Sequence, residues 1–341
     1  MKMKFLAVAL AIGATGLTLG SQAFAAATII NPDGTVALGV NDQGHLNTSA
    51  GTVATNSSVT GLSYKFPDGS WRDATSPGCF CEGWGVSANG SVSGWANADD
   101  GISNLTTNSF SSTASTATSV VSLTSLPGLS VTHAYAPATN APGSLFVANV
   151  TITNTTGNAL TDVKYVRVMD WDVPPTEFSE LVTIKGTTTT TLLDDSHDDG
   201  FASADPLVDS DGAAGTNNAD FEDNGPEDHG AYFRFNFGSL ASGESKTFQI
   251  FYGAAGNESG ALAAIAAEGI ELYSLGQSQT CGDTPSGFVC VADNDAPTFI
   301  FGFRGVGGTP VIPNPVPEPA SLALLGLGLA GMASIRRRKA A

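Results

Sequence analysis

The sequence contains few charged residues and very few basic ones. Only 13% of its 341 residues are charged, and 14 Lys and Arg stand against 32 Asp and Glu. This shortage of positive charge argues against a protein that holds nucleic acid or anionic lipid, because an acidic surface repels phosphate groups. The low lysine content, with abundant Gly, Ser, Thr and Asn, is typical of a secreted β protein rather than a cytosolic enzyme.

The usual signals of catalytic and nucleotide-binding sites are also missing. The four histidines (His45, His133, His197 and His229) are scattered, and no Ser-His-Asp order can be argued from them. No glycine-rich phosphate loop leads from an expected strand into a helix. The sequence therefore gives no positive indication of nucleophilic catalysis or of nucleotide binding.

The start of the chain has the pattern of an export signal. Lys2 and Lys4 precede an apolar run at residues 5–19, and Ala23-Phe24-Ala25 fits the small-residue pattern cut by signal peptidase. We therefore expect residues 1–25 to be a signal peptide that is removed, with cleavage after Ala27 as the alternative.

The end of the chain, residues 316–341, consists of three consecutive segments of different composition. Pro317, Glu318 and Pro319 form a stiff extended tripeptide, because proline fixes its own backbone and disfavours helix in the residue before it. The apolar stretch 320–335 would reach roughly 24 Å as a helix, a thin span for a bilayer. A basic cluster, expected to stay cytoplasmic, follows it. This cluster consists of Arg336, Arg337, Arg338 and Lys339.

This order of pieces resembles the PEP-CTERM sorting signal of Gram-negative bacteria. The resemblance rests on the Pro-Glu-Pro tripeptide, the glycines of the apolar span (Gly326, Gly328 and Gly331) and the terminal arginines. It implies that an exosortase recognises the motif and removes the tail, which the inner membrane holds until then. It also implies a cell-surface or extracellular location, often with exopolysaccharide and biofilm matrix. An ordinary single-pass transmembrane anchor is the alternative.

The part of the chain between these two ends is more acidic than the whole. It keeps 8 basic and 31 acidic residues, a net charge near −23. Such a surface suits solubility outside the cell and the binding of divalent cations.

The four cysteines of an exported chain predict disulfides. We favour a Cys281–Cys290 bond, which closes a short loop. Cys79 and Cys81 would then pair with each other in a strained ring. If that strain is prohibitive, Cys79 and Cys81 would instead each form a disulfide with one of the two cysteines of the 281–290 loop. A C-x-C metal site is a further alternative, although it lacks the paired spacing of a zinc site.

Alternating apolar and polar residues predict an all-β fold of antiparallel sheets packed as a sandwich. Two alternating series, at residues 146–153 and 163–171, flank the turn residues 154–158, and we expect a long hairpin at the centre of the sandwich.

The ectodomain should span residues 28–304 as one sandwich or two, with one short helix at residues 259–267. The Gly- and Pro-rich segment 305–315 should be a linker. Other strands are expected within residues 29–40, 51–66, 103–125, 129–135, 231–237, 245–252 and 299–303.

Residues 194–228 carry 12 acidic residues and neither Lys nor Arg. Ca²⁺ takes six to eight oxygens from carboxylates and loop carbonyls. Asp209-Ser210-Asp211-Gly212 resembles the front of a calcium loop, but no glutamate completes an EF-hand. A solvated, self-repelling loop is the alternative. The predicted Ca²⁺ ligands are Asp194, Asp195, Asp198, Asp199, Asp209 and Asp211.

Two classes of function remain for the ectodomain. We favour a non-catalytic surface or matrix protein with Ca²⁺ or glycan contacts. The alternative is a carbohydrate-active enzyme or glycan-binding module, with Asp170 and Asp172 as a carboxylate pair beside a sugar-stacking Trp171 and with Glu177 nearby. Residues i and i+2 share a strand face, and the carboxyls of glycosidases lie roughly 5–5.5 Å apart in retaining enzymes and roughly 6.5–9.5 Å apart in inverting ones. Productive pairs, however, normally face each other from different strands, and the two aspartates could simply end the hairpin.

Overall fold

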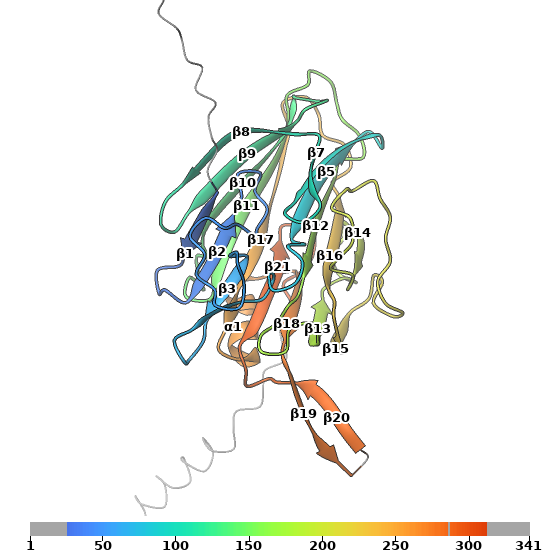
Figure 1. Cartoon of the computed structure of the whole chain (residues 1–341). Coiled ribbons are helices and arrows are strands. Elements are labelled where there is room, and N and C mark those ends of the chain that lie inside the picture. Colours follow the sequence, from blue (N-terminus) through green and yellow to red (C-terminus); the bar gives the residue numbers. More distant parts are fainter. Residues whose placement is uncertain (1–25, 286, 312–341) are drawn as a thin grey trace, which may run out of the picture.

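The computed structural model describes residues 26–285 and 287–311. The predicted signal peptide, the Pro-Glu-Pro tripeptide, the apolar span and the basic cluster lie outside these residues. The described part is mostly β-strand with one helix (Figure 1), which confirms the predicted fold class. None of its helices has the length and apolarity needed to cross a membrane.

Three antiparallel sheets and one separate hairpin contain the strands. A four-stranded sheet is formed by β1 (Ala27–Ile30), β2 (Val36–Val40), β3 (Leu62–Lys65) and β4 (Trp71–Asp73). A six-stranded sheet contains β5 (Gly83–Ala88), β6 (Val92–Asn97), β7 (Gly101–Ser103), β12 (Lys164–Asp170), β14 (Leu193–His197) and β16 (Gly230–Asn236), in the order β14-β16-β12-β5-β6-β7.

The largest sheet has nine strands. They are β8 (Leu105–Ser112), β9 (Ala117–Leu123), β10 (Leu129–Pro137), β11 (Leu145–Asn154), β13 (Glu180–Lys185), β15 (Phe221–Glu227), β17 (Ser245–Ala255), β18 (Leu272–Gln277) and β21 (Thr298–Arg304). Their order is β15-β13-β18-β21-β17-β11-β10-β9-β8.

The inner faces of these sheets share one core. Trp84 of β5 stacks on Tyr165 of β12 with ring centroids 5.9 Å apart, and Tyr165 meets Phe248 of β17 at 5.0 Å. These contacts join the six-stranded sheet to the nine-stranded sheet. Leu38 and Leu62 bring the four-stranded sheet into the same cluster. Among the described residues, the three sheets therefore share one apolar cluster.

The prediction of a hairpin between residues 144 and 173 is wrong, although both of the predicted strands form. β11 pairs with β10 and β17, whereas β12 pairs with β5 and β16. The two strands thus face each other across the core, and residues 155–163 cross between the sheets. An alternating pattern fixes which face of a strand is buried, but it does not choose the neighbouring strand.

Only the end of the strand predicted at residues 51–66 forms, as β3. In the preceding loop, polar side chains take over the backbone hydrogen bonding. The Asn56 amide donates to the carbonyl of Asp73 at 3.0 Å, and the Thr60 hydroxyl accepts from the N–H of Val53 at 3.1 Å. Such local bonds compete with a strand ladder.

The helix α1 (Glu258–Glu268) confirms the prediction for residues 259–267. It covers the outer face of the nine-stranded sheet, where Ile265 packs in a second apolar cluster with Phe251 and Ile300. The helix begins at Asn257, whose side chain accepts the N–H of Gly260 at 2.9 Å. It ends at Gly269, which adopts the left-handed conformation at φ 63°.

Replacing Asn257 by alanine is expected to lower the free energy of unfolding by about 1 kcal/mol, because an N–H at the start of the helix loses its acceptor. Urea denaturation measures the change. Asn257→Ser is the control, since serine caps a helix almost as well and should stay near the wild type. Equal stability of the alanine and serine variants would show that the cap does not matter here.

The chain remains attached to the sandwich beyond Arg304, where a linker was predicted. Val306 is fully buried, and the Glu271 carboxylate accepts the N–H groups of Gly305, Val306 and Gly308 at 3.0 Å each. The N–H of Val311 also donates to the carbonyl of Ile270. The folded part therefore extends past residue 304, at least to residue 311.

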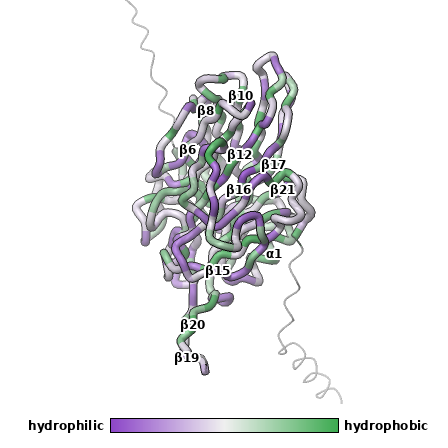
Figure 2. The backbone as a smooth tube through the Cα atoms, turned by 90° about the vertical axis from the view of Figure 1, so that its right-hand side faces the viewer, coloured by the Kyte–Doolittle hydropathy of each residue, from purple (hydrophilic) through white to green (hydrophobic). Residues whose placement is uncertain are grey.

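A hairpin of β19 (Gln279–Thr284) and β20 (Gly287–Ala292) projects from one end of the sandwich (Figures 1 and 2). A disulfide joins Cys281 to Cys290, which face each other in this hairpin. The second disulfide joins Cys79 to Cys81. Both are the pairings that the sequence analysis favours.

Candidate functional site

Half of the predicted Ca²⁺ ligands are paired with Arg234, a residue of β16. Its guanidinium donates to Asp194 at 2.8 Å and to Asp209 at 3.0 Å, and it lies 3.7 Å from Asp195. Lys164 also pairs with Asp194 at 3.1 Å. The acidic segment thus obtains its positive partners from neighbouring strands, which its own sequence does not reveal.

Asp198, another predicted ligand, is buried and surrounded by donors. It accepts from the hydroxyl of Thr216 at 2.7 Å and the amide of Asn224 at 3.0 Å, and it lies 3.3 Å from Nδ1 of His229. Burial alone would raise its pKa, but the bonds from these neighbours hold the pKa of Asp198 well below its usual range. Its oxygens are therefore already occupied by protein groups.

The last two predicted ligands, Asp199 and Asp211, line a surface pocket of about 240 Å³ together with Asp198 and Asp228. Three of the six predicted ligands therefore lie around Arg234, and the other three line this pocket. Among residues 26–285 and 287–311, one group of His, Cys, Asp or Glu has ligand atoms that all lie within 4.8 Å of one another. That group is Asp170, Asp172 and Asp228.

Asp170 and Asp172, predicted as a carboxylate pair, do lie together at the end of β12. Their exposed fractions are 1% and 0%. Burial and neighbouring carboxylates raise the pKa of Asp170 to about 9, while burial raises the pKa of Asp172 to about 7. The sequence analysis missed Asp228, which reaches this place because Asp170 pairs with Gly230 at the start of β16.

Trp171 is not placed to stack on a sugar. The side chain is fully buried, its indole N–H donates to the hydroxyl of Ser274 at 3.0 Å, and its ring packs against Phe299. Glu177 accepts from the amide of Asn56 at 3.0 Å. The predicted aromatic partner of the two aspartates therefore belongs to the core.

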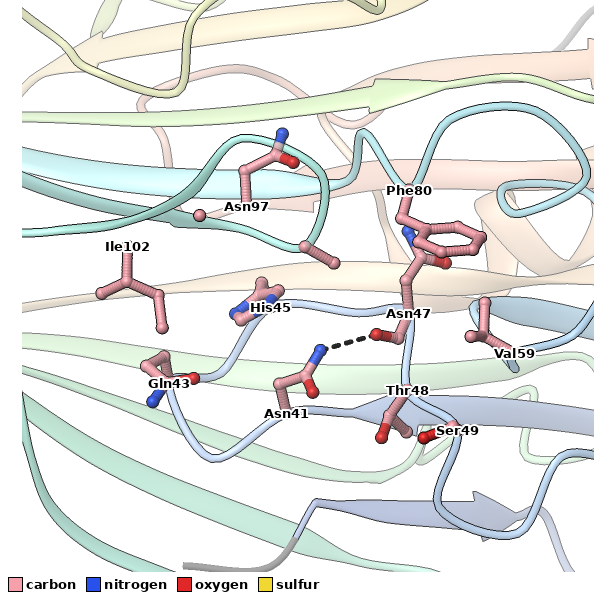
Figure 3. A pocket seen from close by; sticks show the side chains of 12 residues that line it. Asn41, Gln43, His45, Asn47, Thr48, Ser49, Val59, Phe80, Asn97 and Ile102 are labelled. Atoms are coloured by element: carbon pink, nitrogen blue, oxygen red, sulfur yellow. Dashed lines mark hydrogen bonds between the residues drawn. The ribbon is translucent and has the colours of Figure 1, made fainter.

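A second pocket, of about 330 Å³, opens between the loop after β2 and the turn that joins β6 to β7. Figure 3 shows His45 in its middle, with Phe80 and Ile102 on opposite sides. We call it the amide pocket because side-chain amides dominate its polar lining. Its lining residues are Asn41, Gln43, His45, Asn47, Thr48, Ser49, Val59, Phe80, Asn97, Ala98, Gly101 and Ile102.

Two buried groups of the amide pocket have no hydrogen-bond partner within the described protein. They are Nδ1 of His45 and Nδ2 of Asn47, whose side chains belong to residues that are each 4% exposed. Burial and the nearby Arg167 lower the pKa of His45 to about 3, so the imidazole is neutral at physiological pH. Because an unpaired buried polar group is costly, both groups are candidates for ligand contacts.

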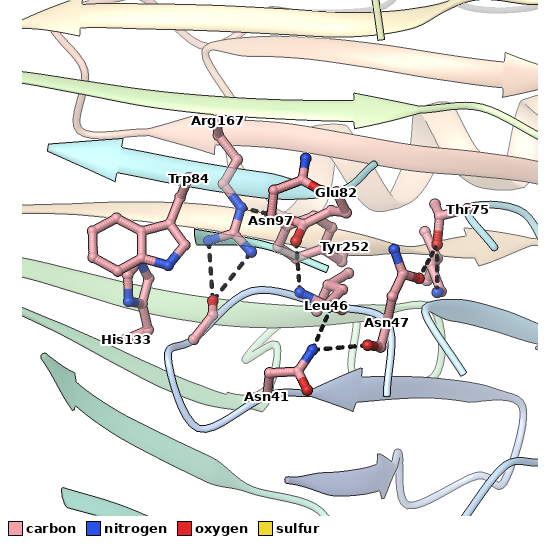
Figure 4. A network of polar contacts seen from close by, with 12 residues as sticks. Asn41, Leu46, Asn47, Thr75, Glu82, Trp84, Asn97, His133, Arg167 and Tyr252 are labelled. Carbon is pink, nitrogen blue, oxygen red and sulfur yellow. Dashed lines mark hydrogen bonds and ion pairs between the residues drawn. The ribbon is translucent and has the colours of Figure 1, made fainter. Parts of the chain in front are cut away.

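A buried ion pair holds the loop that forms one wall of the amide pocket (Figure 4). Arg167 donates to Glu82 at 2.5 Å, and both side chains are fully buried. Glu82 accepts the N–H of Leu46 at 2.6 Å, and both terminal nitrogens of Arg167 donate to the carbonyl of Gly44 at 3.2 Å. The ion pair thus fixes the backbone of residues 44–46 against the six-stranded sheet.

Tyrosines complete the surroundings of this ion pair. Tyr252 donates to Glu82 at 2.9 Å, and Tyr135 accepts from Arg167 at 3.2 Å. Burial alone would lower the pKa of Arg167. Glu82 and the tyrosines together outweigh that effect and hold the pKa of Arg167 well above its usual value. In the alternating series at residues 163–171, Arg167 shares a strand face with Tyr165 and Met169. A charged residue in such a position was the available signal of a buried partner.

The comparisons with known proteins concern the end of the chain. Residues 315–339 match the PEP-CTERM protein-sorting motif. The match confirms the resemblance inferred for residues 316–341. No curated protein matches the chain.

Proposed function

We propose that this PEP-CTERM protein, an exported substrate of an exosortase-type system, is a non-catalytic surface or matrix protein that binds neutral exopolysaccharide. The sorting motif at residues 315–339 supports export with transient membrane anchoring. The amide pocket supports the role of the folded part after export. Exopolysaccharide offers the hydroxyl groups that such a lining can bind.

The observation that carries this proposal is the neutrality of the amide pocket. The chain has a formal net charge of −18, yet the residues that line this pocket include no Asp, Glu, Lys or Arg, and their one histidine, His45, is neutral. Amides, hydroxyls and a neutral imidazole can each donate or accept hydrogen bonds. They match an uncharged ligand rich in hydroxyl groups, whereas a uronic acid or phosphate would meet a repulsive acidic surface.

The apolar residues of the pocket fit the same ligand. Phe80 is half-buried and Ile102 is 52% exposed, so both offer apolar surface on either side of His45 (Figure 3). A sugar ring has an apolar face that an aromatic ring can cover, while polar groups orient the ligand.

The position of Trp171 supports a non-catalytic role. The alternative of a carbohydrate-active enzyme rests on Asp170, Trp171 and Asp172, and the tryptophan of this set is buried in the core. Both carboxyls also come from one strand end rather than from opposite walls of a cleft.

Phe80→Ala is expected to weaken binding to a neutral exopolysaccharide about tenfold, because most of the apolar contact with the sugar is lost. Asn47→Gly should weaken it too. Glycine tolerates the φ of 68° at this position but lacks the amide. Affinity electrophoresis with neutral and uronate-containing polysaccharides measures the effect.

Phe288→Ala is the matched control, because Phe288 is an exposed phenylalanine on the projecting hairpin and lies outside the amide pocket. It should bind like the wild type. Unchanged binding by Phe80→Ala and Asn47→Gly, with unchanged thermal unfolding, would exclude the amide pocket as the polysaccharide site.

A further inference from the structure

We propose that Asp170, Asp172 and Asp228 form a binding site for a hard divalent cation, with Ca²⁺ as the ion. This site shares no residue with the amide pocket, and it stands whether or not polysaccharide binds there. It also differs from the six ligands that the sequence predicted within residues 194–211.

The first argument is the spacing of the three carboxylates. One oxygen from each lies within 4.8 Å of an oxygen from each of the others. Two oxygens that bind the same Ca²⁺ at roughly 2.4 Å can be at most about 4.8 Å apart. The three side chains can therefore reach one ion without any rearrangement of the strands.

The second argument is that the buried oxygens have no donor. Oδ1 of Asp170 and Oδ1 of Asp172 are both buried without a hydrogen-bond partner in the described protein. The other oxygen of Asp170 lies 3.5 Å from the sulfur of Cys79, which is bonded to Cys81 and so carries no proton to donate. Oδ2 of Asp172 has one long bond, at 3.3 Å, from the N–H of Gly78.

The third argument is the sign of the surrounding charge. The titratable groups that act most on Asp170 are Asp172, Asp228, Glu180 and Asp199, all of them acidic. By contrast, Asp194, Asp195 and Asp209 share Arg234. Several carboxylates close together in a buried place repel one another, and a bound cation relieves that repulsion.

Two of the three carboxylates are tightly packed, and the third is exposed to solvent. Gly78 and Gly200 fit so closely against Asp172 and Asp170 that an added Cβ would lie within about 3 Å of each carboxylate. Asp228 is exposed and lines the surface pocket of about 240 Å³. Two fixed ligands with one exposed ligand suit Ca²⁺, which accepts irregular geometry and completes its shell with water, better than Mg²⁺, which demands a near-ideal octahedron.

The test is calcium titration of the chelator-treated protein, with binding measured by calorimetry and stability by thermal unfolding. For the wild type we expect saturable binding with a rise in Tm of several degrees, because an ion that binds only the native state stabilises it. Asp228→Asn should weaken binding at least tenfold and remove most of the Tm rise. Because Asp228 is exposed, this change should leave the fold intact. Mg²⁺ should give a smaller rise at the same concentration.

Asp211→Asn is the matched control. It removes an exposed carboxylate of the segment that the sequence predicted, and it should leave Ca²⁺ binding unchanged. Absence of binding by the wild type would overturn the proposal. So would loss of binding in Asp211→Asn with full binding in Asp228→Asn, because that pattern places the ion in the acidic segment.

Discussion

Replacing Glu82 by leucine is expected to lower the free energy of unfolding by about 3–5 kcal/mol, because Arg167 then keeps its charge in a fully buried place without a carboxylate. The N–H of Leu46 loses its acceptor at the same time. Domains of ordinary stability have only about 5–15 kcal/mol in total. Urea denaturation followed by tryptophan fluorescence would show the change.

The control for this prediction is a double replacement, Glu82→Leu with Arg167→Met. Buried ion pairs exchanged for apolar side chains of similar size are often neutral in stability, so the double variant should be more stable than Glu82→Leu. Glu222→Ala breaks the more exposed pair with Lys185, and it should change stability by less than about 1 kcal/mol. If Glu82→Leu were no less stable than Glu222→Ala, the ion pair would not hold the fold.

The features that the sequence predicts well depend on residues close together in the chain. The helix at residues 258–268 follows from its own composition and ends, and the Cys281–Cys290 pairing follows from a short loop. The buried face of β11 follows from an alternation over a few residues, since Phe146, Ala148, Val150 and Ile152 are all fully buried. The sorting motif is likewise local, with every element within 26 residues.

The features that the sequence misses depend on residues that meet only after folding. β12 follows β11 directly, yet each pairs with strands from distant parts of the chain. Asp228 joins Asp170 through the register of β16 on β12, and nothing near Asp170 in the sequence indicates it. The same applies to Arg234, which contacts Asp194 and Asp195 of β14 and Asp209 of the loop that follows.

The amide pocket, the proposed binding site, could not be predicted from the sequence for the same reason. Gln43, Phe80 and Ile102 belong to three separate segments, and although Phe80 stands between Cys79 and Cys81, nothing in the sequence indicates that the three meet. Their arrangement depends on the backbone at residues 44–46, which the ion pair of Glu82 and Arg167 holds. We therefore expect Glu82→Leu to impair polysaccharide binding as well as stability, in contrast to Phe80→Ala.

Glu318→Ala is expected to abolish release of the protein from the membrane, because the change removes the only charge of the Pro-Glu-Pro tripeptide within the sorting motif. Without processing, the apolar stretch 320–335 and the basic cluster stay attached to the folded part. Intact mass of the protein in the medium, together with the membrane fraction, measures the effect. The wild type should be released with residues 320–341 removed, and the variant should remain in the membrane at its uncut mass.

Glu244→Ala is a suitable control, since it removes a half-exposed carboxylate from the folded part and should be released normally. Because residue 318 lies beyond the described sandwich, Glu318→Ala should not alter thermal unfolding of the folded part, which separates a sorting defect from misfolding. Normal release of Glu318→Ala would contradict recognition at the Pro-Glu-Pro tripeptide. Wild-type protein that kept residues 320–341 would instead identify the tail as a plain anchor, and the folded part would then act while tethered to the membrane.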